Sequence, residues 1–383
     1  MNCQWCVAEG GIHHEAVDSI YPSWLSDSTG SAMRVAALTS GHNTPSARFR
    51  IRQHLPNLRS AGVDVREYCP ALDQAARLPG QLGKVRARYI PPLVIGQMSL
   101  NLALRVPGII GSHRTDVTWL ERNFVPGLDD MVRLLRRPLI VDIDDAIWLY
   151  NPLGKGQIAR LVGHADMVFA GNAFLADWCS QYCSNIRVIP TAVDADRFAP
   201  RLTPKDPDSP FVIGWIGTSG NFRFLKAIEG SLVRFLSDHP SARLMIVADR
   251  APTELSVPLE QLLFRPWNPT TEHLLLHEFD VGIMPIDDSD LSRGKCSFKM
   301  LQYMAAGIPV IASPFGMNKE VLSLGSFGIA AGSSDEWQDA FATFSRSHAK
   351  REAAGRIARD VLINRFSLNK VSENILDSIS FFC

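Results

Sequence analysis

Residues 294–316, GKCSFKMLQYMAAGIPVIASPFG, place cations at the start of a predicted helix. Ser297 is a favourable N-cap, and apolar residues at helical spacing follow from Phe298. The free N–H groups of a first helical turn carry partial positive charge, so Lys295 and Lys299 oppose the helix dipole unless an anion lies between them. The pattern therefore predicts a phosphate or diphosphate site, and two solvated lysines are the alternative.

A second cationic group lies early in the chain. Arg48, Arg50 and Arg52 fall near the start of a predicted helix that Ser46 would cap, after a strand and Gly41. Cations at this end of a helix again favour a bound anion, such as a phosphate of a donor or of a phosphorylated acceptor. Arginines exposed to solvent on an outer face are the alternative.

The loop after a predicted strand at 211–217 contains glycine. Gly217 and Thr218 begin this loop, and Arg223 follows it. Loops of this kind cradle phosphates in many folds, although the spacing here is neither that of the P-loop nor that of the dinucleotide fingerprint. Arg223 is the basic residue expected to face the same anion.

Three aspartates lie at the end of a predicted strand at 138–143. Asp142 and Asp144 would share one face of that strand, as metal chelation requires, and Asp145 follows. The spacing formally matches paired aspartates that hold a metal ion at a diphosphate. Because a three-residue pattern is common by chance, we expect these carboxylates to line a cleft or to cap the next helix, and we expect no metal site.

The composition is that of a globular protein without a global charge. The 383 residues include 39 basic and 39 acidic residues, and 46% are hydrophobic. This balance argues against nucleic acid as a partner and implies that any anion site is local. The length predicts two domains, and the 7 scattered cysteines fit a reducing cytoplasm.

Two long uncharged runs bear on membrane contact. The run 300–318 is interrupted by glycine and proline, so no transmembrane helix is expected there. The run 89–104 is too short to cross a bilayer, but basic residues flank it. A helix lying on a membrane surface through residues 84–114 is compatible with this pattern. A buried or surface helix of the first domain is the favoured alternative.

Short apolar runs rich in β-formers alternate with helical stretches, which predicts parallel sheets with helices on both faces. The expected strands lie near 33–39, 138–143, 167–171, 186–190, 211–217, 244–248, 281–285 and 308–312. The predicted fold class is α/β, with two doubly wound Rossmann-like domains facing a central cleft. We expect a poorly ordered extension at 1–32, domains at 33–198 and 211–362, a proline-rich linker at 199–210, and a C-terminal helical segment at 363–383 that packs back on the first domain.

Four segments resemble a known family. Residues 295–313 resemble the donor-nucleotide motif of retaining glycosyltransferases of the GT-B fold, in the group called glycosyltransferase family 4 or group 1. Residues 188–198 are similar to the signature that precedes the second domain of that group. Residues 211–218 and 38–50 are similar to the first strand and loop of its second and first domains. The resemblance covers roughly residues 33 to 380.

The resemblance implies a nucleotide sugar donor held mainly by the second domain and an acceptor held mainly by the first. It also implies that the sugar is transferred with retention of anomeric configuration, and that no cofactor is needed. The residues expected at the nucleotide sugar are Gly41, Arg48, Arg50, Gly217, Thr218, Arg223, Lys295, Ser297, Phe298, Lys299 and Gln302.

One departure from the family concerns two glutamates, which usually lie eight positions apart. In this chain Gly294 and Gln302 occupy those positions. Gln302 can still hydrogen-bond a ribose hydroxyl, whereas Gly294 cannot replace a carboxylate. The contact that the family's glutamate makes with the donor sugar is then either absent from this chain or made by an aspartate on the same loop. The catalytic residue is therefore unassigned, and the candidates are Asp144, Asp145, Asp288 and Asp290.

The predicted function is transfer of a sugar from a nucleotide diphosphate sugar to a hydroxyl of a glycan, a lipid or a small acceptor. Lys295 and the start of its helix would stabilise the charge that develops on the leaving diphosphate. A sugar-nucleotide epimerase of the same fold and a non-catalytic nucleotide-sugar-binding protein are the alternatives. The expected location is the cytoplasm, either free or at the inner face of the membrane.

Overall fold

The computed structural model describes residues 32–42, 44–71, 91–125, 128–150, 152–203, 205–206 and 209–382, without the side chains of 91–95 and 97. The chain divides into the units Met1–Ala32 and Met33–Cys383. The predicted extension at 1–32 therefore lies outside the described residues, except for Ala32. The predicted membrane segment at 84–114 is described from residue 91 onward.

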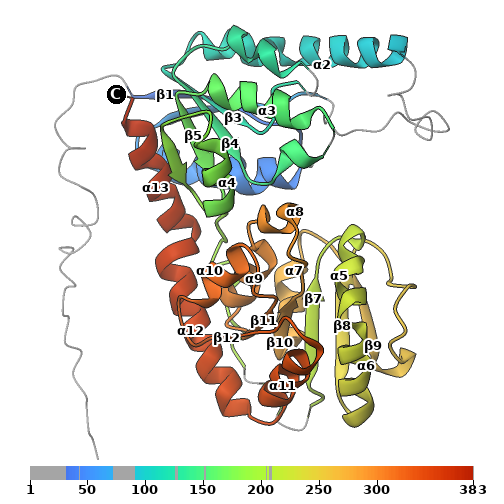
Figure 1. Ribbon diagram of the computed structural model, residues 1–383. Helices are drawn as coiled ribbons and strands as arrows, with labels where there is room; N and C mark the ends of the chain where they lie inside the picture. The colour runs from blue at the N-terminus through green and yellow to red at the C-terminus, as the bar shows by residue number, and fades with distance from the viewer. Residues whose placement is uncertain are drawn as a thin grey trace, which may run out of the picture. The chain divides into compact units, whose positions relative to one another are not determined.

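The first sheet has six parallel strands in the order β2-β1-β3-β4-β5-β6 (Figure 1). Its strands are β1 (Arg34–Leu38), β2 (Asp64–Tyr68), β3 (Val117–Glu121), β4 (Leu139–Ile143), β5 (Met167–Ala170) and β6 (Ile186–Val188). The connecting helices are η2 (Ala47–Ile51), η3 (Arg52–His54), α1 (Leu55–Ser60), α2 (Pro91–Ser112), η6 (Asp129–Leu134), η7 (Ile147–Leu149), α3 (Gly154–Gly163) and α4 (Ala173–Cys179).

The second sheet also has six parallel strands, in the order β12-β11-β10-β7-β8-β9. Its strands are β7 (Val212–Ile216), β8 (Arg243–Ala248), β9 (Leu262–Pro266), β10 (Val281–Met284), β11 (Val310–Ala312) and β12 (Gly328–Ala330). Its helices are η8 (Ser219–Asn221), α5 (Phe222–Ala227), α6 (Glu229–Asp238), η9 (Leu259–Gln261), α7 (Glu272–Leu275), η10 (Leu276–Glu278), α8 (Asp290–Arg293), α9 (Phe298–Ala305), α10 (Met317–Leu322), α11 (Ser334–Ser345), α12 (His348–Phe366) and α13 (Leu368–Ser380).

The two predicted parallel sheets are thus confirmed, and each of the eight predicted strands corresponds to an observed one. Four further strands, β2, β3, β9 and β12, were not predicted. The described residues of the predicted linker at 199–210 form neither helix nor strand. The final helical segment begins at Leu368 rather than at 363, because α12 continues to Phe366.

The last helix of the chain packs against the first sheet. Ile375 and Ile379 of α13 share a buried cluster with Val35 and Trp119. The Nδ1 atom of His54 lies 2.8 Å from the hydroxyl of Ser372, which adds a buried polar contact. Helix α13 therefore covers one face of the first sheet.

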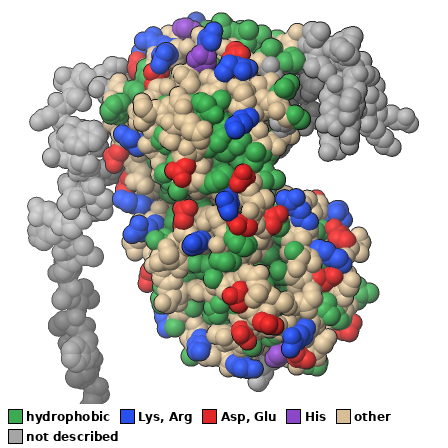
Figure 2. Space-filling model, in the orientation of Figure 1, with side chains coloured by type: hydrophobic (Ala, Val, Ile, Leu, Met, Phe, Trp, Pro, Cys, Tyr) green, Lys and Arg blue, Asp and Glu red, His purple; other side chains and the backbone are tan. Residues whose placement is uncertain are grey.

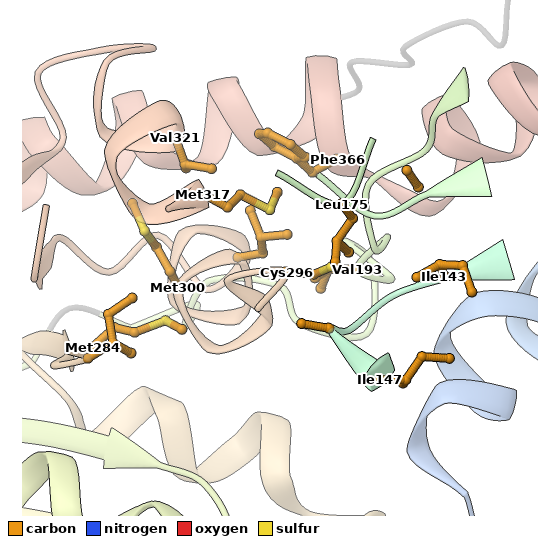
Figure 3. Close-up of a cluster of buried hydrophobic side chains, with 14 of the residues drawn as sticks. Ile143, Ile147, Leu175, Val193, Met284, Cys296, Met300, Met317, Val321 and Phe366 are labelled. Atoms are coloured by element: carbon orange, nitrogen blue, oxygen red, sulfur yellow. The ribbon is translucent and has the colours of Figure 1, made fainter. Parts of the chain in front are cut away.

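A second buried cluster joins the two sheets (Figure 3). Ile143 and Leu175 of the first domain meet Cys296 and Met300 of the second, and Phe366 of α12 lies beside them. Burial of apolar surface between the sheets favours their association in this arrangement. Among the described residues no helix is long and apolar enough to cross a membrane.

Candidate active site

Both sheets reverse their strand order next to the first strand of the domain. In the first sheet β1 lies between β2 and β3, and in the second β7 lies between β8 and β10. Ligands of such open parallel sheets bind beyond the carboxyl ends of the strands at these switch points. The loops after β1 and β3, and those after β7 and β10, are therefore the parts of the chain where a site should lie.

The second switch point brings together the predicted glycine loop and a predicted lysine. Gly217 follows β7, and a Cβ atom on it would lie 2.5 Å from Cε of Lys299, so the absent side chain makes room for the lysine. Nζ of Lys299 lies 5.8 Å from the centre of the Trp215 ring. Burial, together with the nearby charge of Lys295, lowers the pKa of Lys299 to about 8. Two ammonium groups therefore approach one another at the carboxyl end of this sheet.

Arg223 and Asp287 belong to the same neighbourhood. Arg223 is exposed near the start of α5 and contributes to lowering the pKa of Asp287. Burial alone would raise that pKa, but hydrogen bonds from Ser289 and Ser292 outweigh it. Thr218 is exposed, and its hydroxyl accepts a hydrogen bond from the amide of Asn221.

The predicted role of Ser297 as a side-chain cap of α9 is wrong. Ser297 precedes the helix but has a left-handed backbone (φ 49°) and makes no capping hydrogen bond. Its hydroxyl instead donates to Oδ1 of the buried Asn318 at 2.7 Å. Asn318 donates in turn to the carbonyls of Met284 and Ser313. The side chain of Ser297 therefore leaves the first-turn N–H groups of α9 to other partners.

Other predicted residues of the second domain have protein partners. The ring of Phe298 packs on Phe49 of the first domain, with 4.2 Å between ring centres. Gln302 is buried within α9. Asp288 accepts two hydrogen bonds from Arg293, at 2.8 and 3.0 Å, and Asp290 lies 4.0 Å from the same guanidinium.

The predicted arginine helix is irregular, since η2 is a π-helical turn followed by the 3₁₀ turn η3, and Ser46 makes no capping hydrogen bond. Arg50 is 2% exposed and pairs with Asp142 at 2.8 Å. Burial opposes its charge, but Asp142 holds the pKa of Arg50 above its ordinary value. Arg52 pairs with Glu67. Protein carboxylates are thus the anions that these two arginines bind.

Arg48 also pairs with a carboxylate, Glu272 of the second domain, at 3.3 Å. Arg197 shares the same oxygen, and the indole N–H of Trp267 donates to the other oxygen at 2.8 Å. The predicted Gly41 is buried, and its carbonyl accepts from Arg52. These contacts place Arg48 between the two domains.

Two of the catalytic candidates belong to the end of β4. Asp144 pairs with Arg122, and Asp145 accepts a hydrogen bond from the hydroxyl of Tyr150. Arg122 has a positive φ of 56°, a strained conformation that is frequent at functional sites. The described residues contain no cluster of three or more His, Cys, Asp or Glu side chains that could hold a metal ion.

Glu121 and Ser40 were missed by the sequence reasoning. Glu121 ends β3 and is fully buried, and its Oε2 accepts from the backbone N–H of Ser40 at 2.8 Å. Its other oxygen lies 3.8 Å from Nε of Arg122. Among the described residues, neither that oxygen nor the hydroxyl of Ser40 has a hydrogen-bond partner. Both residues flank the switch point between β1 and β3. Predicting β3 as a strand would have drawn attention to Glu121 as its last residue.

The comparisons with known proteins bear on the fold and on the second domain. Residues 211–346 match the family model "Glycosyl transferases group 1". The structure is similar to sucrose-phosphate synthase from Thermosynechococcus elongatus, with a TM-score of 0.67, 12% identity, and coverage of 91% of this chain and 98% of that one. It is also similar to Anabaena HepE in complex with UDP and glucose, with a TM-score of 0.64, 15% identity, and coverage of 91% and 100%.

The trehalose-6-phosphate synthase OtsA is a third similar structure, with a TM-score of 0.62, 12% identity, and coverage of 91% of this chain and 99% of that one. No curated protein matches the chain. The structural likenesses establish the fold, and the family match concerns residues 211–346 alone. The chain therefore has the GT-B fold, and its residues 211–346 match the model of the glycosyl transferases group 1.

Proposed function

We propose that this chain is a glycosyltransferase that uses a nucleoside diphosphate sugar, with a UDP-sugar as the first candidate, and retains the anomeric configuration. The observation that supports the donor site is a contrast between two groups of cationic residues. Arg48, Arg50 and Arg52 have carboxylate partners, whereas within the described part of the chain neither Lys295 nor Lys299 forms an ion pair. A diphosphate would supply the missing negative charge.

The similar structures support this assignment of the donor. HepE was solved with UDP, with UDP and glucose, and with UDP-glucose. In the present chain, Gly217 and the start of α9 flank the β7–β10 switch point, where a diphosphate would lie beside Lys299. Preorganised cations and backbone N–H groups at that place would stabilise the negative charge on the leaving diphosphate.

Calorimetry with UDP and GDP tests the donor site. Lys295→Ala should weaken nucleoside diphosphate binding roughly tenfold or more, since it removes one charge-assisted hydrogen bond. Lys319→Ala is the matched control, because Lys319 is exposed on α10 of the same domain. Equal affinities for wild type and both variants would show that the lysines are simply solvated. Turnover of the donor without any acceptor would instead favour an epimerase.

For the acceptor, we propose a hydroxyl group held at the switch point of the first sheet. Within the described part of the chain, Oε1 of Glu121 is buried and receives no hydrogen bond, although Nε of Arg122 lies 3.8 Å away, and the buried hydroxyl of Ser40 has no hydrogen-bond partner. A buried polar atom without a hydrogen bond is costly, so such atoms gather where a ligand completes them. A carboxylate is an acceptor for the O–H groups of a sugar, a glycan or a lipid headgroup.

We also propose a peripheral contact with the cytoplasmic face of an anionic membrane through α2. The exposed positions of its described side chains are Gly96, Ser99, Leu100, Ala103, Val106, Pro107 and Ile110, none of them charged. The charged residue of this helix, Arg105, is buried and donates to the carbonyls of Thr39 and Phe124. Leu102 and Ile109 pack against the core, so α2 has apolar residues on its inner side and an uncharged outer side as well.

Cations lie beside this apolar face. Arg114, Arg133 and Arg136 are exposed, and Nε2 of His113 lies 3.0 Å from the carbonyl of Leu134, which joins α2 to η6. In Figure 2, hydrophobic side chains and those of Lys, Arg and His adjoin along the upper edge, where Figure 1 shows α2. Apolar residues flanked by cations fit the interface of an anionic bilayer. Free thiols such as Cys179 and Cys296 fit a cytoplasmic location.

A further inference from the structure

The backbone that carries Lys295 is held by a side chain of the other domain. Asn172 follows β5 and is 2% exposed. Its amide nitrogen donates to the carbonyls of Arg293 and Lys295, at 3.2 and 3.1 Å. Its amide oxygen accepts from the N–H of Leu175 at 2.9 Å and so caps α4. One buried amide thus links the start of α4 to the loop of residues 293–296, termed here the docking loop.

The fit around the docking loop requires small residues. A Cβ atom on Gly294 would lie 2.6 Å from Cβ of Ala146 in the first domain. A Cβ atom on Gly171 would lie 2.3 Å from Sγ of Cys296, and that thiol donates to the carbonyl of Asp144 at 3.0 Å. A glutamate at position 294 would therefore collide with the first domain in this arrangement.

The opposite side of the docking loop rests on the second domain. A Cβ atom on Gly316 would lie 2.8 Å from Cα of Arg293, and Gly316 has a positive φ of 51°. The loop is therefore enclosed by both domains, and its conformation depends on their contact. Lys295, which is partly buried, and the start of α9 are carried by this segment.

We propose that Asn172 is a positioning residue: from the first domain, it fixes the docking loop so that Lys295 and the start of α9 face the diphosphate of the donor. Gly294 makes this contact sterically feasible, which gives a physical reason for a glycine where related enzymes usually have a glutamate. The inference rests on the proposed function, because it assigns the diphosphate to Lys295. It adds that the acceptor-side domain helps to order the donor site.

The reaction rate of the Cys296 thiol measures the contact between the docking loop and the first domain, and this measurement needs no known acceptor. Cys296 and Cys179 are both buried, and burial raises the pKa of each thiol to about 12. Both should therefore react slowly with N-ethylmaleimide in the folded chain. Cys296 lies at the contact between the domains, whereas Cys179 lies in α4 of the first domain. Peptide mass spectrometry on the full chain measures the two rates in one sample.

The first variant is Asn172→Ser, which keeps an oxygen that can cap α4 but lacks the amide donor. We expect Cys296 to react about tenfold faster, Cys179 to react at its wild-type rate, and UDP to bind several-fold more weakly, as expected for two lost hydrogen bonds. In the Lys295→Ala background the same substitution should weaken UDP binding no further, because Asn172 acts through that lysine. An unchanged Cys296 rate, unchanged UDP affinity, or additive effects would each overturn the proposal.

Gly294→Ala is the second variant, and it leaves the cap of α4 intact. It should expose Cys296 to the reagent while Cys179 remains protected. This variant is needed if Asn172→Ser also accelerates the reaction of Cys179, because that result would mean that α4 itself has been disturbed. A wild-type rate for Cys296 in Gly294→Ala would overturn the docking contact. If the wild-type chain binds neither UDP nor GDP, the proposed donor fails, while the Cys296 rates still test the contact itself.

Discussion

At the residue scale, Lys299 should make nucleotide binding depend on pH. Its pKa of about 8 lies below the ordinary value of a lysine because of burial and Lys295. A diphosphate is fully ionised above pH 7, so the loss of affinity on raising the pH would come from deprotonation of the lysine. If the protonated form alone binds, UDP affinity should fall about tenfold between pH 7 and pH 9.

Calorimetry at three pH values across this range measures the effect. Lys299→Gln should bind weakly at every pH, with most of the dependence removed, since glutamine does not titrate. A wild-type affinity that stays constant through pH 8, or a variant with the same slope as wild type, would contradict a role for this lysine at the diphosphate.

Glu121 carries a second prediction at this scale. Glu121→Gln keeps an oxygen for the N–H of Ser40 but removes a buried charge whose Oε1 receives no hydrogen bond from the described residues. Arg122, which lies 3.8 Å from that oxygen, keeps its ion pair with Asp144. We expect an unchanged or higher melting temperature and wild-type UDP affinity, because residues kept for a ligand often cost stability. Release of UDP from UDP-glucose, measured with a panel of sugar acceptors, should fall at least tenfold. A lower melting temperature with full activity would mark Glu121 as a structural residue.

Two anion sites were predicted from cations at helix starts, and the arginines of one of them have carboxylate partners in the structure. The partner of Arg50 is Asp142, and that of Arg48 is Glu272, far along the chain. A sequence pattern cannot show which distant carboxylate will fill a cationic position. Lys299 and the loop of Gly217 could be expected to lie together because β7 and β10, which precede them, are adjacent strands of one sheet. Ser297 was correctly predicted to precede the helix, but its hydroxyl bonds to Asn318 instead of capping the helix.

At the scale of elements, three of the four strands that were not predicted from the sequence share one physical feature. β2, β9 and β12 lie at the edges of their sheets and are partly exposed, so they do not show the continuous apolar runs of central strands. β3 is central and fully buried, but threonine and glutamate interrupt its pattern. The order of strands around β1, and with it the place of Glu121, could not be predicted without β3.

The uncharged outer side of α2 carries the prediction of this scale. Sedimentation with phosphatidylcholine vesicles containing phosphatidylglycerol should retain the chain, and pure phosphatidylcholine should retain less. Replacing both Arg133 and Arg136 by glutamate should reduce binding roughly tenfold or more, since each cation near an anionic surface contributes about 1 kcal/mol. The matched control replaces the exposed Arg346 and Arg356 of the second domain in the same way. An equal loss of vesicle binding for both pairs of substitutions would show a general electrostatic attraction and no specific contact through α2.

At the scale of the whole molecule, the contact of α13 with the first domain depends on a neutral histidine. His54 is 1% exposed beside Ser372, and burial, with the charge of Arg50 nearby, lowers its pKa from 6.5 to about 3. Between these values the unfolded chain binds a proton that the folded chain does not. The stability from this group is therefore present above pH 6.5 and is lost progressively as the pH falls toward 3.

This linkage predicts a slope of about 1.4 kcal/mol per pH unit in the free energy of unfolding across that window, from one extra proton taken up on unfolding. Urea unfolding at several pH values measures it. His54→Asn should remove this part of the slope, because asparagine can still meet the hydroxyl of Ser372 but does not titrate. His113→Asn, at an exposed histidine, should keep the wild-type slope. Identical slopes in wild type and His54→Asn would mean that protonation of His54 does not account for the loss of stability in acid.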